Sequence, residues 1–259
     1  MRRQPSRGTP DGPSAPDDGD GDGARHAYPA NRVLEQLPAP TLDRLASHLH
    51  RVTLQRRDVL FRAHEPIASV VFPTTAVVSF VASLRTGETL EVGLVGRDGF
   101  APTSVFPGMV AMTCDGVVQI PGEAYRVDAA VLRRELLHDE PLHAALGHHA
   151  ELMLARCMQI SMCNMFHPAE QRCIRWLLTV HDLTGRDDLP FTHELIATML
   201  GVRRPTVSLV LGALHHAGLV KEARGHIQFL DRPGLEQACC ECYRAMRADR
   251  PRMWVASHR

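Results

Sequence analysis

The chain has no net charge and almost no lysine. Its 29 Lys and Arg residues balance 29 Asp and Glu residues, and Lys221 is the only lysine in 259 residues. This balance excludes a polycation that binds nucleic acid through overall charge. A nucleic-acid surface would therefore depend on where the arginines lie.

The sequence also has no long apolar run and no regular cysteine pattern. Its longest apolar stretches, such as residues 69–84, are interrupted by polar residues and are shorter than the ~20 apolar residues of a membrane helix. Seven cysteines, an odd number with irregular spacing and no secretory leader before them, suit a reducing compartment. We therefore expect a cytoplasmic protein that does not contact a membrane.

Residues 52–127 carry short β-branched runs separated by turn residues. The expected strands are Val52–Leu54, Val59–Phe61, Ser69–Phe72, Ala76–Leu84, Glu88–Val95, Gly116–Ile120 and Ala124–Val127. Turns such as Thr86-Gly87 and Asp98-Gly99 supply the reversals, because Gly and Asp tolerate positive φ. Many short, closely spaced strands predict a sandwich or barrel, and we expect a jelly roll.

Helical periodicity follows, with a short helix ending near Leu137 and a long one from about Pro141 to Asn164. Six residues of the long helix alternate at spacings of four and three: Leu146, Ala150, Met153, Cys157, Ile160 and Asn164. This seam could pack on the barrel of its own chain or on a second chain. We favour a homodimer, because the element that follows usually binds DNA in pairs.

That element is a helix-turn-helix at residues 191–217. Thr192 can cap the first helix, Gly201 makes the turn, and Pro205 stands in the first turn of a helix from about Arg204. Gly218 ends this second helix, and residues 219–222 and 226–230 predict a two-stranded wing. Two short helices around a glycine turn, followed by a hairpin, indicate a winged helix-turn-helix.

The placement of cations supports DNA binding. Arg203 and Arg204 begin the second helix, whose start enters the major groove in such domains, while Lys221, Arg224 and Arg232 lie on or beside the wing. Arginine can bind guanine O6 and N7 with two hydrogen bonds, so we expect Arg204 to read bases. The alternative is that the two arginines are simply exposed to solvent at the start of the helix and do not bind DNA.

The chain resembles the Crp/Fnr transcription factors over residues 45–235. The resemblance rests on this order of elements and on three stretches, Gly201–Ser208, Gly218–Val220 and Gly225–Ile227. The resemblance implies an α+β fold with an N-terminal cyclic-nucleotide-binding-like β jelly roll, a long dimerisation helix and a C-terminal winged helix-turn-helix. It also implies base contact by Arg204 and backbone contact by Thr192 and Thr206. The predicted DNA-binding residues are Thr192, His193, Arg203, Arg204, Thr206, Ser208, Lys221 and Arg224.

Two positions depart from the family pattern in the second helix. Pro205 and Leu209 stand where many members have an acidic residue and a second arginine, so the operator sequence stays open.

The expected domains are a disordered tail at residues 1–28, a sensor domain at 29–138, a dimerisation helix at 139–166, the winged helix-turn-helix at 167–237 and a C-terminal tail at 238–259. The expected partners are double-stranded DNA and a second copy of the chain, with RNA polymerase as a further candidate.

The sensor half lacks the cation that cyclic-nucleotide-binding relatives use for the phosphate. The stretch that resembles their phosphate-binding turn is Val95–Pro102, running on through Met112–Cys114, and no Lys, Arg or His lies between Asp98 and Ala124. A buried phosphate without a cation is costly. We therefore predict that the protein does not bind cyclic AMP in the usual way, and we interpret Arg97 as a surface partner of Asp98 rather than a ligand residue.

No metal or other cofactor is assigned from the sequence. Cys239, Cys240 and Cys242 lack paired C-x-x-C spacing, so we interpret them as buried or reducible thiols of unknown role, with thiol sensing left open. An enzyme is not expected either. A metal-dependent jelly roll needs two or three barrel histidines, and the predicted barrel has only His64, with His48 and His50 just before it. The remaining alternative is a dimeric protein-interaction module whose helix-turn-helix does not bind DNA.

Overall fold

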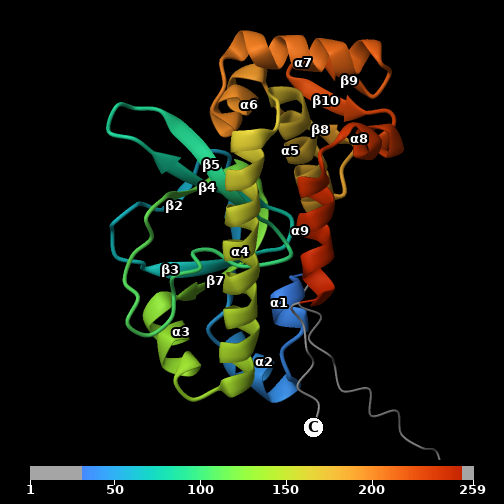
Figure 1. Ribbon diagram of the computed structural model, residues 1–259. Helices are drawn as coiled ribbons and strands as arrows, with labels where there is room; N and C mark the ends of the chain where they lie inside the picture. Colours follow the sequence, from blue (N-terminus) through green and yellow to red (C-terminus); the bar gives the residue numbers. More distant parts are fainter. Residues whose placement is uncertain (1–30, 253–259) are drawn as a thin grey trace, which may run out of the picture.

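The computed structural model describes residues 31–252. The predicted disordered tail at residues 1–28 and the last seven residues of the predicted C-terminal tail lie outside the described residues. Figure 1 shows a β-sheet domain on one side of a long helix and a mostly helical domain at one end of it. The described chain begins with two short helices, α1 (Arg32–Glu35) and α2 (Ala39–Ala46).

Seven strands form the N-terminal β domain and confirm the seven predicted runs. They are β1 (His50–Leu54), β2 (Val59–Phe61), β3 (Ser69–Pro73), β4 (Val77–Ser83), β5 (Thr89–Val95), β6 (Asp115–Ile120) and β7 (Gly122–Asp128). They pair antiparallel in two sheets, β1-β7-β3 and β2-β6-β4-β5. Leu54 and Ala124 from the first sheet share a core with Phe61, Phe80 and Val118 from the second, so the sheets pack face to face.

Two helices follow the sheets, α3 (Ala129–Leu136) and the 27-residue α4 (Glu140–Phe166). Asp128 caps α3, and Asp139 caps α4 by accepting the Leu142 N–H at 2.9 Å. Asp139 also accepts from Thr41 and pairs with Arg44, both in α2, so these contacts hold the start of α4 to α2.

The predicted heptad seam of α4 faces the barrel of its own chain, which was the alternative to a dimer contact. Leu146, Met153 and Ile160 are 0%, 4% and 8% exposed. Gly93 of β5 leaves room for Met153, whose sulfur would lie 3.1 Å from a Cβ added at that glycine. The assignment of these residues to a dimer contact is therefore corrected.

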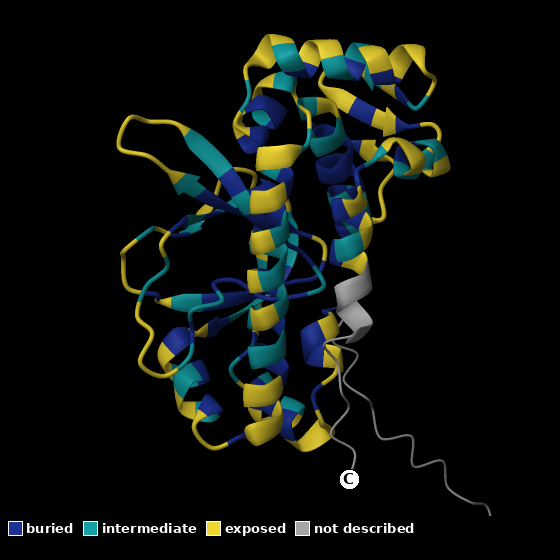
Figure 2. Cartoon of the chain, in the orientation of Figure 1, coloured by how far each residue is buried: buried dark blue, intermediate teal, exposed yellow. Residues whose placement is uncertain are grey.

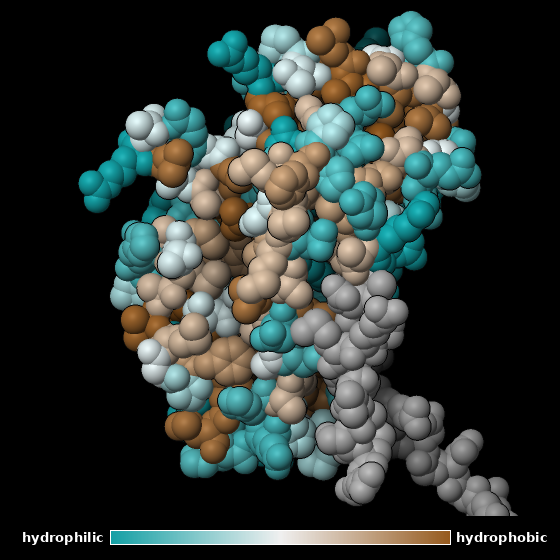
Figure 3. All heavy atoms as spheres, in the orientation of Figure 1, coloured by the Kyte–Doolittle hydropathy of each residue, from teal (hydrophilic) through white to brown (hydrophobic). Residues whose placement is uncertain are grey.

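A second apolar stripe runs along the outer face of α4. Leu154, Met158, Met162 and Met165 are 49%, 60%, 55% and 76% exposed, and their spacing of four, four and three places them on one helix face. Figure 3 shows side chains of apolar character gathered along α4 on the viewed face.

The C-terminal domain contains the expected helix-turn-helix and wing. Its elements are α5 (Ala169–Thr184), β8 (Asp188–Leu189), α6 (His193–Leu200), α7 (Arg204–His216), β9 (Val220–Ala223), β10 (His226–Phe229), α8 (Arg232–Ala238) and α9 (Glu241–Arg252). The predicted wing hairpin is β9–β10, and β8, which was not predicted, joins it in a sheet of order β8-β10-β9.

The segment predicted as a C-terminal tail folds as helix α9 up to Arg252, which corrects that interpretation. Figure 1 shows α9 beside α4 and below α5. Cys242 and Tyr243 are 1% and 2% exposed. The Tyr243 hydroxyl donates to Asp182 at 3.0 Å and accepts from Arg232 at 2.8 Å, which ties α9 to α5 and α8.

The C-terminal domain packs directly on the sheet β2-β6-β4-β5. Val77 and Val81 of β4 share one core with Leu177 and Leu200, so both faces of β4 are covered. This explains why β4 has a nearly continuous apolar run rather than an alternating one. Figure 2 shows buried residues where the two domains meet and exposed residues along the outer side of α7.

Among the described residues no single helix is long and apolar enough to cross a membrane. The helices α6 and α7 reach that length and composition only as a pair, and they are bent by 111° at the turn between them.

Candidate nucleic-acid interface

Local sequence signals set the geometry of the helix-turn-helix. The Thr192 hydroxyl accepts the Leu195 N–H at 3.3 Å and caps α6. Gly201 ends α6 with φ +61°, a left-handed conformation that a residue with a Cβ adopts at a cost. Ile196 of α6 and Leu211 of α7 are both fully buried in the common core. The turn and this packing fix the 111° bend that leaves the other side of α7 exposed.

The start of α7 is an exposed, positively charged helix end. Arg203, Arg204 and Ser208 are exposed while Val207 and Leu211 face the core. Arg203 occupies the cap position, and its side chain makes no capping hydrogen bond within the described chain. The N–H groups of Thr206 and Val207 already donate to the Arg203 carbonyl, so the helix dipole and the two guanidinium groups are what favour an anion at this end.

Arg204 is paired with Glu194 at 3.6 Å between Nε and Oε2, across the turn between the helices. The two side chains are 67% and 76% exposed, so water and salt screen the pair. The guanidinium group is therefore available to exchange this partner for a base or a phosphate.

His193 and Ser208, both predicted to bind DNA, contact each other and the wing. His193 Nδ1 lies 2.9 Å from the Ser208 hydroxyl, and its Nε2 lies 2.6 Å from Oε2 of Glu222 in β9. One imidazole thus connects α6, α7 and the wing. Its contacts hold the recognition helix and the wing in a fixed relation.

A groove of about 450 Å³ lies between the start of α7 and the wing, and Thr192, Arg204 and Arg224 are among the residues that line it. The wing turns at Arg224-Gly225, whose φ values of 46° and 83° suit a two-residue hairpin loop. Lys221 and Arg224 are exposed on this hairpin. Arg204 and Arg224 thus stand on the two sides of the groove, which Glu194 and Glu222 also line.

Arg232 was expected beside the wing, with the cations that could neutralise phosphate, and the structure corrects this. Its guanidinium group pairs with Asp182 at 2.6 Å and with Glu236 at 3.0 Å. Although burial opposes the charge, hydrogen bonds to Asp182 and the nearby Tyr243 and Glu236 raise the pKa of Arg232. Arg232 therefore holds α8 to α5 instead of facing the groove.

The loop that resembles a phosphate-binding turn is occupied by side chains of α4. Asp98 pairs with Arg156 at 2.8 Å, and the two side chains are 6% and 13% exposed. The expected pairing of Asp98 with Arg97 is therefore replaced by a buried pair with α4. A Cβ at Gly99 would lie 1.8 Å from Cε1 of His149, so the imidazole fills the space against this loop.

His149 is neutral in this position. Burial lowers the pKa of His149 to about 4, even though the nearby Asp98 carboxylate opposes the shift. The neutral ring nitrogen Nε2 accepts the Phe100 N–H at 3.3 Å. The loop is thus fastened to α4 by one ion pair and one hydrogen bond.

An exposed recognition helix, a basic wing and a two-sheet domain joined by a long helix define a winged helix-turn-helix protein with an N-terminal β domain. Residues 171–238 match the family model of the Crp-like helix-turn-helix domain, so this part of the chain is such a domain. No curated protein matches the chain.

Solved structures share the fold over nearly their whole length. A Crp/Fnr-family regulator from Eubacterium rectale has a TM-score of 0.63 and 16% identity, covering 80% of this chain and 96% of its own. FixK2 from Bradyrhizobium japonicum has a TM-score of 0.63 and 16% identity, covering 74% and 98%. The c-di-GMP-responsive regulator CLP from Xanthomonas campestris has a TM-score of 0.60 and 20% identity, covering 75% and 100%. The described chain therefore has the fold of Crp/Fnr structures, which confirms the predicted architecture.

Proposed function

We propose that the protein is a sequence-specific, DNA-binding transcription regulator of the Crp/Fnr type and not an enzyme. The observation that carries the proposal is the exposed start of α7, with Arg203 and Arg204, beside a basic wing in a Crp-like helix-turn-helix domain. A cytoplasmic location goes with this function, and RNA polymerase is a candidate partner.

Each predicted DNA-binding residue has a proposed role in the complex. Arg204 enters the major groove and binds a guanine edge with two hydrogen bonds, a contact that discriminates by about 1–3 kcal/mol against the wrong base. Arg203, Thr206 and Thr192 contact the sugar-phosphate backbone around the start of α7, and Lys221 and Arg224 contact phosphates from the wing.

His193 and Ser208 contribute mainly by positioning, because their polar atoms already bind each other.

A homodimer is proposed through the outer face of α4. Leu154, Met158, Met162 and Met165 form an exposed apolar stripe that a second α4 would cover. Two recognition helices related by a two-fold axis would enter successive major grooves ~34 Å apart on a roughly palindromic site. A change in the angle between the two α4 helices would change that spacing.

We further propose that the β domain does not bind cyclic AMP in the usual way. Support comes from the lack of Lys, Arg and His between Asp98 and Ala124 and from the contacts that fasten the turn to α4. A signal of another kind would act by binding one state of the dimer better than the other.

The test is electrophoretic mobility shift across a salt series, on fragments from upstream of the gene, without cyclic AMP. We expect salt-sensitive, sequence-specific retardation. Arg204→Ala should remove its sequence specificity, and Arg62→Ala, at an exposed arginine on the β domain, should leave it unchanged. No retardation of any fragment at low salt would contradict DNA binding and favour the protein-interaction module.

A further inference from the structure

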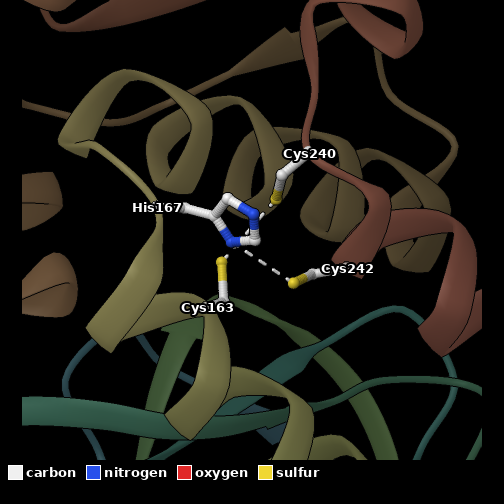
Figure 4. Close-up of side chains that lie close together, drawn as sticks. All are labelled: Cys163, His167, Cys240 and Cys242. Atoms are coloured by element: carbon white, nitrogen blue, oxygen red, sulfur yellow. Dashed lines mark hydrogen bonds between the residues drawn. The ribbon is translucent and has the colours of Figure 1, made fainter.

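Four side chains that commonly bind metal ions meet where α4 ends and α9 begins. Cys163 lies in the last turn of α4 and His167 follows that helix, while Cys240 precedes α9 and Cys242 lies in its first turn. One ligand atom from each residue lies within 4.8 Å of all the others. Figure 4 shows the four side chains pointing toward one another from two separate parts of the chain.

The spacing of these atoms suits a single ion. Cys163 Sγ lies 3.7 Å from Cys240 Sγ, and Cys242 Sγ lies 3.5 Å from Nδ1 of His167. A tetrahedral zinc ion has bonds of about 2.3 Å to sulfur and about 2.0 Å to nitrogen, which imply edges of roughly 3.8 Å and 3.5 Å. In a [4Fe–4S] cluster each of the four ligands binds a different iron, and in a [2Fe–2S] cluster they are divided between two irons, so four ligand atoms around either cluster do not all lie as close together as around one ion.

The ligand set is enclosed by protein. Cys163, Cys240 and Cys242 are 0%, 4% and 1% exposed, and the His167 side chain is 17% exposed. Four protein ligands, three of them thiols, with little access to water are typical of a structural zinc site. A catalytic site would keep one position open to water or substrate.

The histidine is oriented for binding through Nδ1. Its other nitrogen, Nε2, lies 3.2 Å from the carboxylate of Glu241. A neutral ring that donates its Nε2–H to this carboxylate presents the Nδ1 lone pair to the three sulfur atoms. A carboxylate that fixes the tautomer of a metal-binding histidine is a common outer contact in zinc sites.

Two further side chains donate to the sulfur atoms. Arg175 Nε lies 3.2 Å from Cys163 Sγ, and Gln159 Nε2 lies 3.1 Å from Cys242 Sγ. Arg175 is only 4% exposed, and an isolated buried cation is costly. Three thiolates around a divalent ion carry one net negative charge, and the buried guanidinium group is placed to balance it.

We propose that Cys163, His167, Cys240 and Cys242 bind one zinc ion that fastens α9 to the end of α4. Binding would release a proton from each thiol that is protonated beforehand, because thiolates are the ligands. The ion would join the long helix to the helices that support the DNA-binding domain. This proposal does not depend on DNA binding.

The test uses the full chain kept reduced during purification, with metal content measured before and after addition of zinc and removal of the excess. We expect about one zinc per chain in the wild type, loss of zinc in Cys163→Ser and Cys242→Ser, and full retention in Cys239→Ser. Cys239 is the matched control, because it adjoins the site but is outside the ligand set. Circular dichroism shows whether each variant is folded.

Cobalt substitution of the wild type provides a readout that does not depend on the variants folding. Tetrahedral Co²⁺ bound by thiolates has intense visible bands and a thiolate charge-transfer band in the near ultraviolet, and His167→Ala should shift both. Failure of the wild type to retain either ion would overturn the proposal. An iron-sulfur chromophore, a Cys163–Cys240 disulfide that forms in preference to metal binding, or equal zinc loss in Cys239→Ser would also overturn it.

Discussion

Glu91 should make the stability of the protein fall as pH rises toward 8. This side chain is buried at the junction of the two domains, where its carboxyl accepts from Ser79 at 2.6 Å and from Trp176 Nε1 at 2.8 Å. Burial raises the pKa of Glu91 to about 8, although both hydrogen bonds and the nearby charge of Arg175 act in the opposite direction. Desolvation of the charged form is therefore the dominant effect.

The sign follows from where the proton is held. Between about pH 4.5 and pH 8 the folded chain keeps the Glu91 proton, while the unfolded chain has released it. The folded state then binds more protons, so the free energy of unfolding decreases as pH rises, by at most about 1.4 kcal/mol per pH unit. From pH 5 to pH 7 the loss is roughly 2.5 kcal/mol. It is complete once the pH exceeds the folded pKa.

Urea unfolding of the wild type and of Glu91→Gln at pH 5, 6, 7 and 8 measures this effect. Glutamine keeps an acceptor for Trp176 and cannot ionise, so the variant should lack this component of the pH dependence. The difference between the two proteins removes contributions from the 15 histidines. Parallel stability profiles, or a variant that loses relative stability as pH rises, would refute the reasoning.

Three further changes have defined outcomes. Gly99→Ala should lower the free energy of unfolding, measured with urea, by about 1–3 kcal/mol, because the added Cβ would overlap the buried ring of His149. Gly147→Ala is the control: a Cβ there has no neighbour within 4 Å in the described chain, so this variant should not destabilise the protein. Arg224→Ala should reduce the slope of log affinity for DNA against log salt concentration by about 1, which corresponds to one phosphate contact, in fluorescence anisotropy titrations. An unchanged slope would exclude that contact. Met158→Glu should give monomers in sedimentation velocity, while Leu137→Glu, an exposed control at the C-terminal end of α3, should stay dimeric. Dimers of both variants would exclude the α4 stripe as the dimer contact.

Local signals predicted most of the fold. The seven strands and the helix-turn-helix could be found because turn residues and periodicity mark each element, as Gly201 and Gly218 do. Helix α9 was missed because its arginine-rich sequence has a low mean hydropathy, and its buried residues, such as Tyr243, depend on partners in α5 and α8. The wing strand β8 was missed because its two residues are too few to show the alternating apolar and polar pattern of a strand.

The sequence was less informative about which face of α4 points inward. Apolar residues stand on both faces, so the heptad containing Met153 and the outer stripe containing Met158 compete as candidate contact surfaces. Packing against the β domain determines which of the two faces is buried. In the same way the role of His193 depends on Glu222, which is 29 residues away and approaches only when the wing folds back.

The candidate metal site does not follow the paired C-x-x-C spacing that marks many zinc sites in a sequence. Its ligands form two short pairs, Cys163 and His167 four residues apart and Cys240 and Cys242 two apart, and neither pair is a C-x-x-C motif. The available signal in the sequence was the four-residue spacing of Cys163 and His167, which places two metal-binding side chains together at the end of one helix. Its partners are more than 70 residues further along the chain, where only the packing of α9 brings them near.

The most direct test of the central claim is selection of binding sites from random double-stranded DNA with the purified protein, followed by footprinting of the selected site. The account predicts a roughly palindromic sequence with half-sites about one helical turn apart and a guanine in each half-site whose preference disappears in Arg204→Ala. Failure to enrich any sequence at low salt, or enrichment of the same sequence by Arg204→Ala with equal affinity, would contradict it.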